Sequence, residues 1–294
     1  MEHGHQHHHH HEAAGTDSVD VAELLDLDAS VLHAYWADVT SWVRRQSTGG
    51  PTRRILDLGA GTGTGTIALA HRFGGSEVVA LDVSAAMLAR VRTKAFDLGL
   101  VGRVRTLEAD LAGTWPVAEP VDLIWASMAL HELDDPDRLL EEAYAGLRPA
   151  GLMAVAEMDA PLRFLPDDLD LGVPGLEARC LAALAELTHH ARPFGSDWGP
   201  PLEAAGFTLV ATRSFAIDLP SLPSSTSGRY ARGWFHKMRS ALADRLDAED
   251  LATLDTLIDS HGPEGLLQRG DLVVRGGRTA WVARRPSVSH VHEA

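Results

Sequence analysis

Residues 55–70 read ILDLGAGTGTGTIALA, in which four glycines occupy alternate positions after a short apolar run. The apolar run contains Asp57, and the residues after the glycines have apolar side chains at helical spacing. Glycine permits positive φ angles and close backbone approach, and the first turn of a helix has unpaired N–H donors. The segment therefore predicts a strand, a tight turn and a helix that together form a cradle for a ligand.

The spacing of the glycines distinguishes between possible ligands. Dinucleotide-binding folds use G-x-G-x-x-G to place a pyrophosphate at a helix N-terminus, and phosphate-binding NTPase loops need a G-K-[ST] that this segment lacks. The pattern here is D-x-G-x-G-x-G, which places the carboxylate of Asp57 at the end of the strand. A carboxylate repels a pyrophosphate and suits an ammonium group. The pattern thus disfavours a dinucleotide-dependent dehydrogenase.

Further predicted strands follow, and two of them end in acidic residues. Residues 76–91 predict a strand that ends at Asp82, about 20 residues past the glycine turn, which is the spacing of a ribose-binding acid in such folds. Residues 104–111 predict a third strand with Asp110 at its end. The fourth and fifth predicted strands lie within residues 121–133 and 147–160. Strands that alternate with helices favour a parallel sheet covered on both faces.

With these five elements in order, the chain resembles the class I S-adenosylmethionine-dependent methyltransferases, closely over residues 53–160 and more loosely over 195–285. The resemblance implies an α/β fold of the Rossmann-like, doubly wound type. Its seven-stranded sheet would be mostly parallel, with helices on both faces and two antiparallel strands at the end. The resemblance also implies S-adenosyl-L-methionine as the cofactor, S-adenosyl-L-homocysteine as the product, and transfer of a methyl group to O, N or C of a small acceptor.

The same resemblance implies roles for individual residues. Asp57 would meet the methionine ammonium, Asp82 the ribose hydroxyls and Asp110 the adenine amino group. The other implied cofactor-binding residues are Gly59, Ala60, Gly61, Gly63, Val83, Met87, Leu111, Ala126 and Ser127. His131 and Glu132, which follow the fourth strand, are the candidates for acid–base catalysis. Alternatively, His131 packs against the cap and Glu132 faces water.

The rest of the chain is expected to extend this core. A histidine-rich, disordered segment (1–18) and a helical extension (19–50) precede the cofactor-binding core (51–160), and the second half of the same domain (161–285) and a flexible tail (286–294) follow it. Helical cap insertions are expected at 161–194 and 221–262, where they would shape the substrate pocket. In the helical extension, Tyr35 and Trp36 either fill the edge of the sheet or close over the cofactor.

The first eleven residues contain seven of the sixteen histidines. This tract is either an expression tag or a native metal-binding segment. Its neutral imidazoles would bind nickel, zinc or copper in vitro, with His7, His8, His9, His10 and His11 as the ligands. We expect no catalytic role for the tract and no metal in the active site.

Composition disfavours several functional classes. The 41 acidic and 26 basic residues give a net charge of −15, which disfavours nucleic acids and anionic membranes as partners. The single cysteine, Cys180, rules out an internal disulfide, and no apolar run has the length of a membrane span. We therefore expect a cytoplasmic monomer or homodimer that acts on a small molecule. Two alternatives remain: a methyltransferase for a protein or RNA component, and a non-catalytic cofactor-binding or metal-handling protein that uses the histidine tract.

Overall fold

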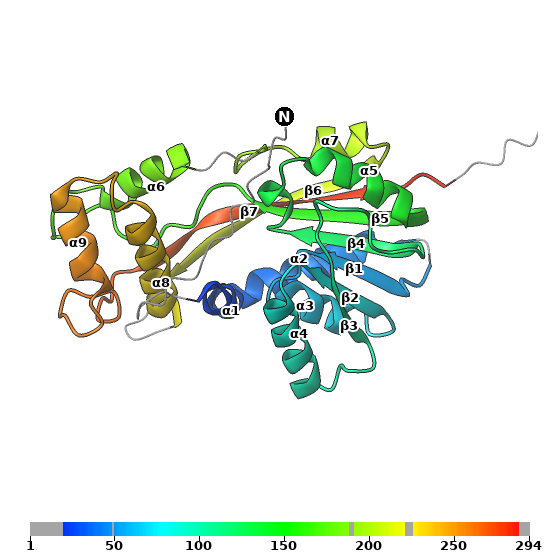
Figure 1. The fold of residues 1–294 in the computed structure, drawn as a ribbon, viewed down its shortest axis with the longest axis horizontal. Helices are drawn as coiled ribbons and strands as arrows, with labels where there is room; N and C mark the ends of the chain where they lie inside the picture. The colour runs from blue at the N-terminus through cyan, green and yellow to red at the C-terminus, as the bar shows by residue number, and fades with distance from the viewer. Residues whose placement is uncertain (1–19, 49, 188–190, 221–225, 288–294) are drawn as a thin grey trace, which may run out of the picture.

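The computed structural model describes residues 20–48, 50–187, 191–220 and 226–287 (Figure 1). Its strands form one sheet in the order β3-β2-β1-β4-β5-β7-β6. They are β1 (Arg54–Leu58), β2 (Glu77–Asp82), β3 (Val104–Glu108), β4 (Val121–Ser127), β5 (Leu147–Met158), β6 (Thr208–Pro220) and β7 (Val273–Arg284). Strands β1 to β5 are parallel, and β7 is antiparallel to both of its neighbours. This architecture confirms the predicted fold class.

Helices cover both faces of the sheet, because successive side chains of a strand point to opposite faces. In β1, Ile55 joins one apolar cluster, whereas Leu56 and Leu58 join the other. The first cluster lies under α2 (His33–Gln46), α3 (Thr64–Arg72) and α4 (Ala85–Asp97). The second lies under α5 (Pro136–Gly146) and α7 (Gly199–Ala204), on the opposite side of the sheet in Figure 1. A strand buried on both faces reads as a nearly continuous apolar run, which explains the sequence of β1.

The cap is built at the far end of the long antiparallel strands β6 and β7. Helices α6 (Leu176–Leu187), α8 (Thr226–Ala241) and α9 (Ala248–Ile258) gather there, away from the parallel strands (Figure 1). Helix α1 (Val21–Val31) packs against α8 and so connects the N-terminal extension to the cap. The cap therefore stands over one end of the sheet instead of covering a face of it.

One detail of the C-terminal half corrects the sequence analysis. The sequence at Asp271–Arg284 predicts either a hairpin-like strand pair or one long edge strand. The structure has one long strand here, but β7 lies between β5 and β6 and not at the edge. Its small and apolar residues are almost fully buried there, including Ala280, Val282 and Ala283. Strand β6 forms the edge of the sheet. In agreement with that position, its side chains alternate between buried and exposed near the cap and are half-buried or exposed elsewhere.

Two expectations fall partly or wholly on residues that the structure does not describe. The histidine-rich segment 1–18, with His7 to His11, lies outside the described residues, as does most of the 286–294 tail. In the part of the chain that is described, no helix has both the length and the apolar character needed to cross a bilayer.

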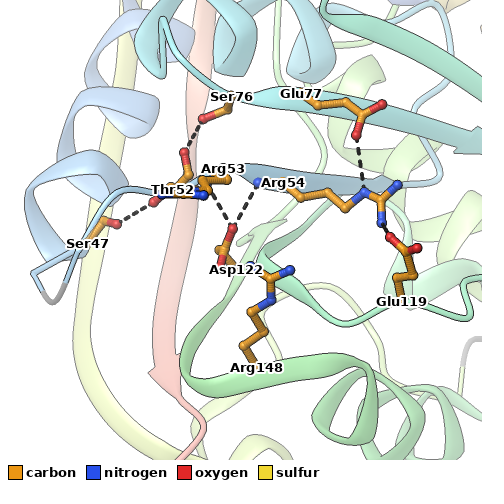
Figure 2. Close-up of polar contacts among 9 residues, drawn as sticks. All are labelled: Ser47, Thr52, Arg53, Arg54, Ser76, Glu77, Glu119, Asp122 and Arg148. Atoms are coloured by element: carbon orange, nitrogen blue, oxygen red, sulfur yellow. Dashed lines mark hydrogen bonds and ion pairs between the residues drawn. The ribbon is translucent and has the colours of Figure 1, made fainter.

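A polar network at the amino ends of the strands fixes the start of β1 (Figure 2). Asp122, in the second position of β4, accepts hydrogen bonds from the backbone N–H groups of Arg53 and Arg54 at 2.8 and 2.9 Å. The Asp122 carboxylate also pairs with Arg148, and the Arg54 side chain pairs with Glu77 of β2. These contacts tie β1 to β2 and β4. The network lies at the edge opposite the ends of the strands where open α/β sheets bind ligands, so we assign it a structural role.

Candidate active site

A cavity of about 520 Å³ opens at the carboxyl ends of the parallel strands. It lies where the strand order reverses between β1 and β4, the position at which open α/β sheets bind ligands. Its walls come from the β1–α3 turn, the ends of β2 and β4, helix α1 and helix α8. The volume falls within the range of small-molecule sites. The topology thus places a half-open chamber between the sheet and the cap.

The glycine turn after β1 has the backbone conformation that its sequence predicts. Gly59, Gly61 and Gly63 have φ angles of 64°, 52° and 88°, a region that other residues rarely adopt. A Cβ atom on Gly59 would lie 2.6 Å from the Cβ atom of Ala129, which belongs to the segment after β4. The chain can therefore pass between β1 and the β4 exit only with glycine at this position.

We expect Gly59→Ala to lower the free energy of unfolding by about 1–3 kcal/mol, because it combines an unfavourable φ with a contact that the Ala129 side chain cannot relieve. Chemical denaturation measures this change. Gly74→Ala is the matched control, since a Cβ atom there meets nothing within 4 Å and its φ is not in the left-handed region. Equal stability of the two variants would contradict the role given to Gly59.

Asp57 is the most unusual group in the chamber wall. Its side chain is 2% exposed, and the Oγ1 hydroxyl of Thr66 donates a hydrogen bond of 2.6 Å to its Oδ2 atom. Burial raises the pKa of Asp57 to about 7, the Thr66 hydrogen bonds lower it, and the nearby charge of Asp82 raises it. Among the described residues no basic side chain forms an ion pair with this carboxylate. A buried acid without a counter-ion is suited to a cationic ligand.

The acids at the ends of β2 and just beyond β3 also line the chamber. Asp82 accepts hydrogen bonds from the backbone N–H groups of Gly61 at 2.8 Å and Ser84 at 2.9 Å. Asp110 accepts one from the backbone N–H of Ala112 at 2.8 Å. Each carboxylate oxygen can accept more than one hydrogen bond, so both groups keep acceptor capacity for a ligand. The backbone contacts hold the two carboxylates in place toward the cavity.

Most of the predicted site residues lie in the cavity wall. Those that line it are Asp57, Gly59, Ala60, Gly61, Asp82, Val83, Met87, Asp110, Leu111, Ser127 and Glu132. Within the described residues, Gly63, Ala126 and His131 are not part of the wall. Gly63 is the N-cap of α3, and Ala126 is fully buried in the core under α5. Of the two aromatic residues singled out in the helical extension, Trp36 lines the chamber and Tyr35 does not.

His131 lies behind the wall, between two carboxylates. Its Nδ1 atom is 2.7 Å from Oε2 of Glu157, and its Nε2 atom is 3.1 Å from Oε1 of Glu132. Burial by itself lowers the pKa of His131, but the hydrogen bonds to Glu132 and Glu157 outweigh it and raise the pKa to about 9. The ring of Phe194 packs against the imidazole at a centroid distance of 5.0 Å. At neutral pH the imidazole is therefore charged and cannot accept a proton.

Glu157, at the end of β5, organises the segment that leaves β4. One carboxylate oxygen accepts hydrogen bonds from the backbone N–H groups of Ala129 and Leu130, and the other contacts His131. Next to these residues, Met128 lines the chamber with a φ of 57°. A non-glycine residue in this conformation is held there at a cost by its surroundings. The Glu157 carboxylate supplies contacts that keep the β4 exit in this shape.

Several chamber residues were not singled out in the sequence as site residues, although Tyr230 and Trp234 lie in the cap insertion expected at 221–262. Asp28 comes from α1, Tyr230 and Trp234 from α8, and Arg278 from β7, so more than 200 residues of chain separate the first from the others. Trp125 lies in the apolar run of β4, where it resembles a core residue. Only Trp125 stood inside a recognisable motif, next to the strand end. No group of three or more His, Cys, Asp or Glu side chains that could hold a metal occurs in the described ranges.

Comparison with known proteins agrees with this geometry. Residues 55–151, which run from β1 into β5, match the family model described as a methyltransferase domain. This segment matches a methyltransferase domain, and the sheet around it has the fold of the class I S-adenosylmethionine-dependent methyltransferases. A solved protein from Bacillus halodurans C-125 superposes on this chain with a TM-score of 0.55 at 20% identity, covering 85% of this chain and 100% of that one. At that identity the superposition supports the fold alone.

Two curated relatives of this chain are trans-aconitate 2-methyltransferases. The protein from Variovorax paradoxus is 36% identical over 106 residues, which are 36% of this chain and 39% of the relative. The protein from Methylobacterium radiotolerans is 33% identical over 198 residues, or 65% of each chain. The chain thus spans between about four tenths and two thirds of these relatives.

Proposed function

We propose that this protein transfers the methyl group of S-adenosylmethionine to an oxygen, nitrogen or carbon atom of a small acceptor. The observation that carries the proposal is the buried carboxylate of Asp57, which lies in the wall of the chamber without a counter-ion. S-adenosylmethionine carries an ammonium group and a sulfonium, so it supplies the positive charge that this site lacks.

The chain's own residues would bind and orient the two substrates. When bound, the cofactor supplies an electrophilic methyl group on its sulfonium. Asp57 would hold the ammonium group, Asp82 would accept the ribose hydroxyls, and Asp110 would accept from the adenine amino group. The glycine turn lets the backbone approach the ligand closely. A Cβ atom on Gly61 would lie 3.2 Å from the Leu25 side chain, so there is little room for a larger residue at this position. Holding nucleophile and methyl carbon together can supply about 7–11 kcal/mol of the barrier reduction.

The acceptor would bind between the cofactor cradle and the cap. That part of the chamber is lined by apolar and aromatic side chains of α1, the β5–α6 loop and α8, including Leu24, Leu162, Phe164, Tyr230 and Trp234. The enclosure by α1 and α8 supports a small molecule over a protein or RNA acceptor. The trans-aconitate 2-methyltransferases among the relatives make trans-aconitate the first compound to test.

The structure favours different roles for the two candidate catalytic residues. Glu132 lines the chamber and has a side chain that is 68% exposed, so it is the group we propose to accept a proton from a hydroxyl or amine acceptor. His131 lies behind the wall and carries a proton at neutral pH, so we propose that it positions Glu132 and the β4 exit. In that role His131 acts through Glu132 and not on the substrate.

Calorimetric titration with S-adenosylmethionine, S-adenosylhomocysteine and NAD tests the proposal. We expect micromolar binding of both sulfur compounds and none of NAD. Asp82→Ala should weaken binding of both at least about 100-fold, because it removes a charged acceptor of two ribose hydroxyls. Asp97→Ala changes an exposed acid at the end of α4 and serves as the control. Absence of binding to either sulfur compound would overturn the proposed function.

The remaining expectations stay predictions. A cytoplasmic location and a monomeric or homodimeric state rest on composition alone. A non-catalytic, metal-handling role for the histidine tract is tested by deleting residues 1–11: under the proposed function this deletion leaves cofactor binding and methyl transfer unchanged.

A further inference from the structure

Arg278 places a positive charge deep in the acceptor half of the chamber. The residue lies on β7 opposite Met158 of β5, is 2% exposed, and lines the cavity. Its Nη2 atom donates a hydrogen bond of 2.6 Å to Oδ1 of Asp28. Its guanidinium carbon lies 4.9 Å from the centre of the Tyr35 ring. These contacts hold the planar group in one orientation.

The guanidinium is only partly satisfied by these partners. Its Nε and Nη1 atoms are buried and have no hydrogen-bond partner. The same Asp28 oxygen that contacts Arg278 also accepts a hydrogen bond of 3.0 Å from the hydroxyl of Tyr230. Asp28 thus serves two donors, and it neutralises the charge of Arg278 without occupying its remaining N–H groups. Buried charged donors without acceptors are costly, so they mark a place where a ligand can supply the acceptor.

Other unpartnered polar atoms in the chamber wall include further donors. The indole Nε1 atoms of Trp36 and Trp234 are buried without a hydrogen-bond partner, and both residues line the chamber. Lys237, one turn of α8 beyond Trp234, lines it as well. On the acidic side, Asp57, Asp82 and Asp110 belong to the cofactor cradle, and Glu132 lies at the β4 exit. An acceptor that fits the donors must present oxygen atoms with lone pairs.

We propose that the methyl acceptor carries a carboxylate and that Arg278 binds it, which makes Arg278 a specificity-determining residue. This inference rests on the proposed function, because it names the acceptor class of that site. A carboxylate matches the fork of N–H groups of a guanidinium, and the burial of Arg278 strengthens such a pair. The aromatic and aliphatic walls would hold the rest of the acceptor.

Direct titration with matched pairs of compounds tests the inference. The probes are trans-aconitate, trans-cinnamate and octanoate, together with the amide of each, added up to about 10 mM with and without S-adenosylhomocysteine. We expect at least one carboxylate to bind about 10-fold or more tightly than its amide. If no carboxylate binds better than its amide, the inference is overturned.

The variant Arg278→Lys then tests whether Arg278 is the residue that binds the carboxylate. The lysine keeps the charge beside Asp28 but loses the planar fork, so we expect carboxylate binding to weaken about 10-fold while the affinity for S-adenosylhomocysteine changes less than about twofold. Arg275→Lys is the matched control, since Arg275 lies on the same strand, is not part of the described chamber wall, and contacts the carbonyl of Leu165. Unchanged carboxylate binding in Arg278→Lys would overturn the assignment.

The two proposals fail in different ways. Lack of binding of S-adenosylhomocysteine to the unmodified protein contradicts the proposed function, whereas the titrations without it still decide whether the chamber prefers carboxylates. Binding of S-adenosylhomocysteine together with equal affinity for carboxylates and amides contradicts only the role of Arg278. If Arg278→Lys fails to fold, the comparison of carboxylates with amides on the unmodified protein still decides the acceptor class.

Discussion

Asp57→Asn is expected to weaken binding of S-adenosylmethionine at least about 100-fold, and to stabilise the ligand-free protein above pH 7. Removing one partner of a buried ion pair costs about 3–5 kcal/mol. The asparagine keeps the size of the side chain and an acceptor for the Thr66 hydroxyl, so the turn should keep its shape. The substitution therefore separates the charge of Asp57 from its packing.

The gain in stability follows from the raised pKa of Asp57. Burial raises this pKa to about 7 in the folded protein, above the value of about 3.9 for an unfolded chain. The unfolded state then releases the proton more readily, so the stability contributed by the protonated carboxyl is lost as the pH rises from about 4 to about 7. Above pH 7 the ligand-free protein buries an uncompensated charge, and Asp57→Asn should raise its free energy of unfolding by about 2–4 kcal/mol.

Calorimetry and chemical denaturation between pH 5.5 and 8, an interval of about one unit or more on either side of the raised pKa, measure both effects. Cofactor affinity of the unmodified protein should fall as the pH drops below about 7, while the affinity of Asp57→Asn should stay constant. Asp97→Asn makes the same chemical change on an exposed surface and should alter neither quantity. If Asp57→Asn binds the cofactor like the unmodified protein, Asp57 does not hold the ammonium group.

Glu157→Gln is expected to destabilise the protein by about 2–4 kcal/mol at pH 6.5, because it leaves the buried imidazolium of His131 without its closest charge partner. Losing the contribution of Glu157 lowers the pKa of His131, because burial opposes its charge and Glu132 is then the remaining carboxylate that raises the pKa. The Glu132 side chain is 68% exposed, so water screens its charge. The amide oxygen of the glutamine can still accept hydrogen bonds from the backbone N–H groups of Ala129 and Leu130, so the substitution removes the charge of Glu157 and keeps the shape of the β4 exit.

The effect of Glu157→Gln should depend on pH. The pKa of His131 is raised in the folded protein to about 9, so its contribution to stability is complete below about pH 6.5 and is lost as the pH rises to about 9. Unfolding free energies of the unmodified protein and the variant should therefore differ most at low pH and converge near pH 9. Glu141→Gln, on the exposed side of α5, is the control. A difference that is the same at both ends of this range would rule out the His131–Glu157 charge pair as its source.

The cofactor half of the site could be predicted from the sequence because its determinants are local. The glycine turn requires positive φ angles at neighbouring positions, and Asp57 precedes it directly on β1. Asp82 and Asp110 each lie at or just beyond the end of a parallel strand, and parallel strands bring their carboxyl ends to one edge of the sheet.

The acceptor half could be recognised only in the tertiary structure. Asp28, Tyr230 and Arg278 come from α1, α8 and β7, and each segment by itself has the pattern of an ordinary amphipathic helix or buried strand. Their meeting depends on the length of β6 and β7, which carry the cap to the position where α8 packs against α1. Likewise, the sequence places Glu132 next to His131, but only the tertiary structure brings Glu157 of β5 to the other ring nitrogen and buries the imidazole between the two carboxylates. A short sequence motif predicts local backbone geometry, because the residues that determine this geometry are neighbours in the chain. Burial and ion pairing depend on contacts between segments that are distant in sequence, so the tertiary structure is needed to recognise them.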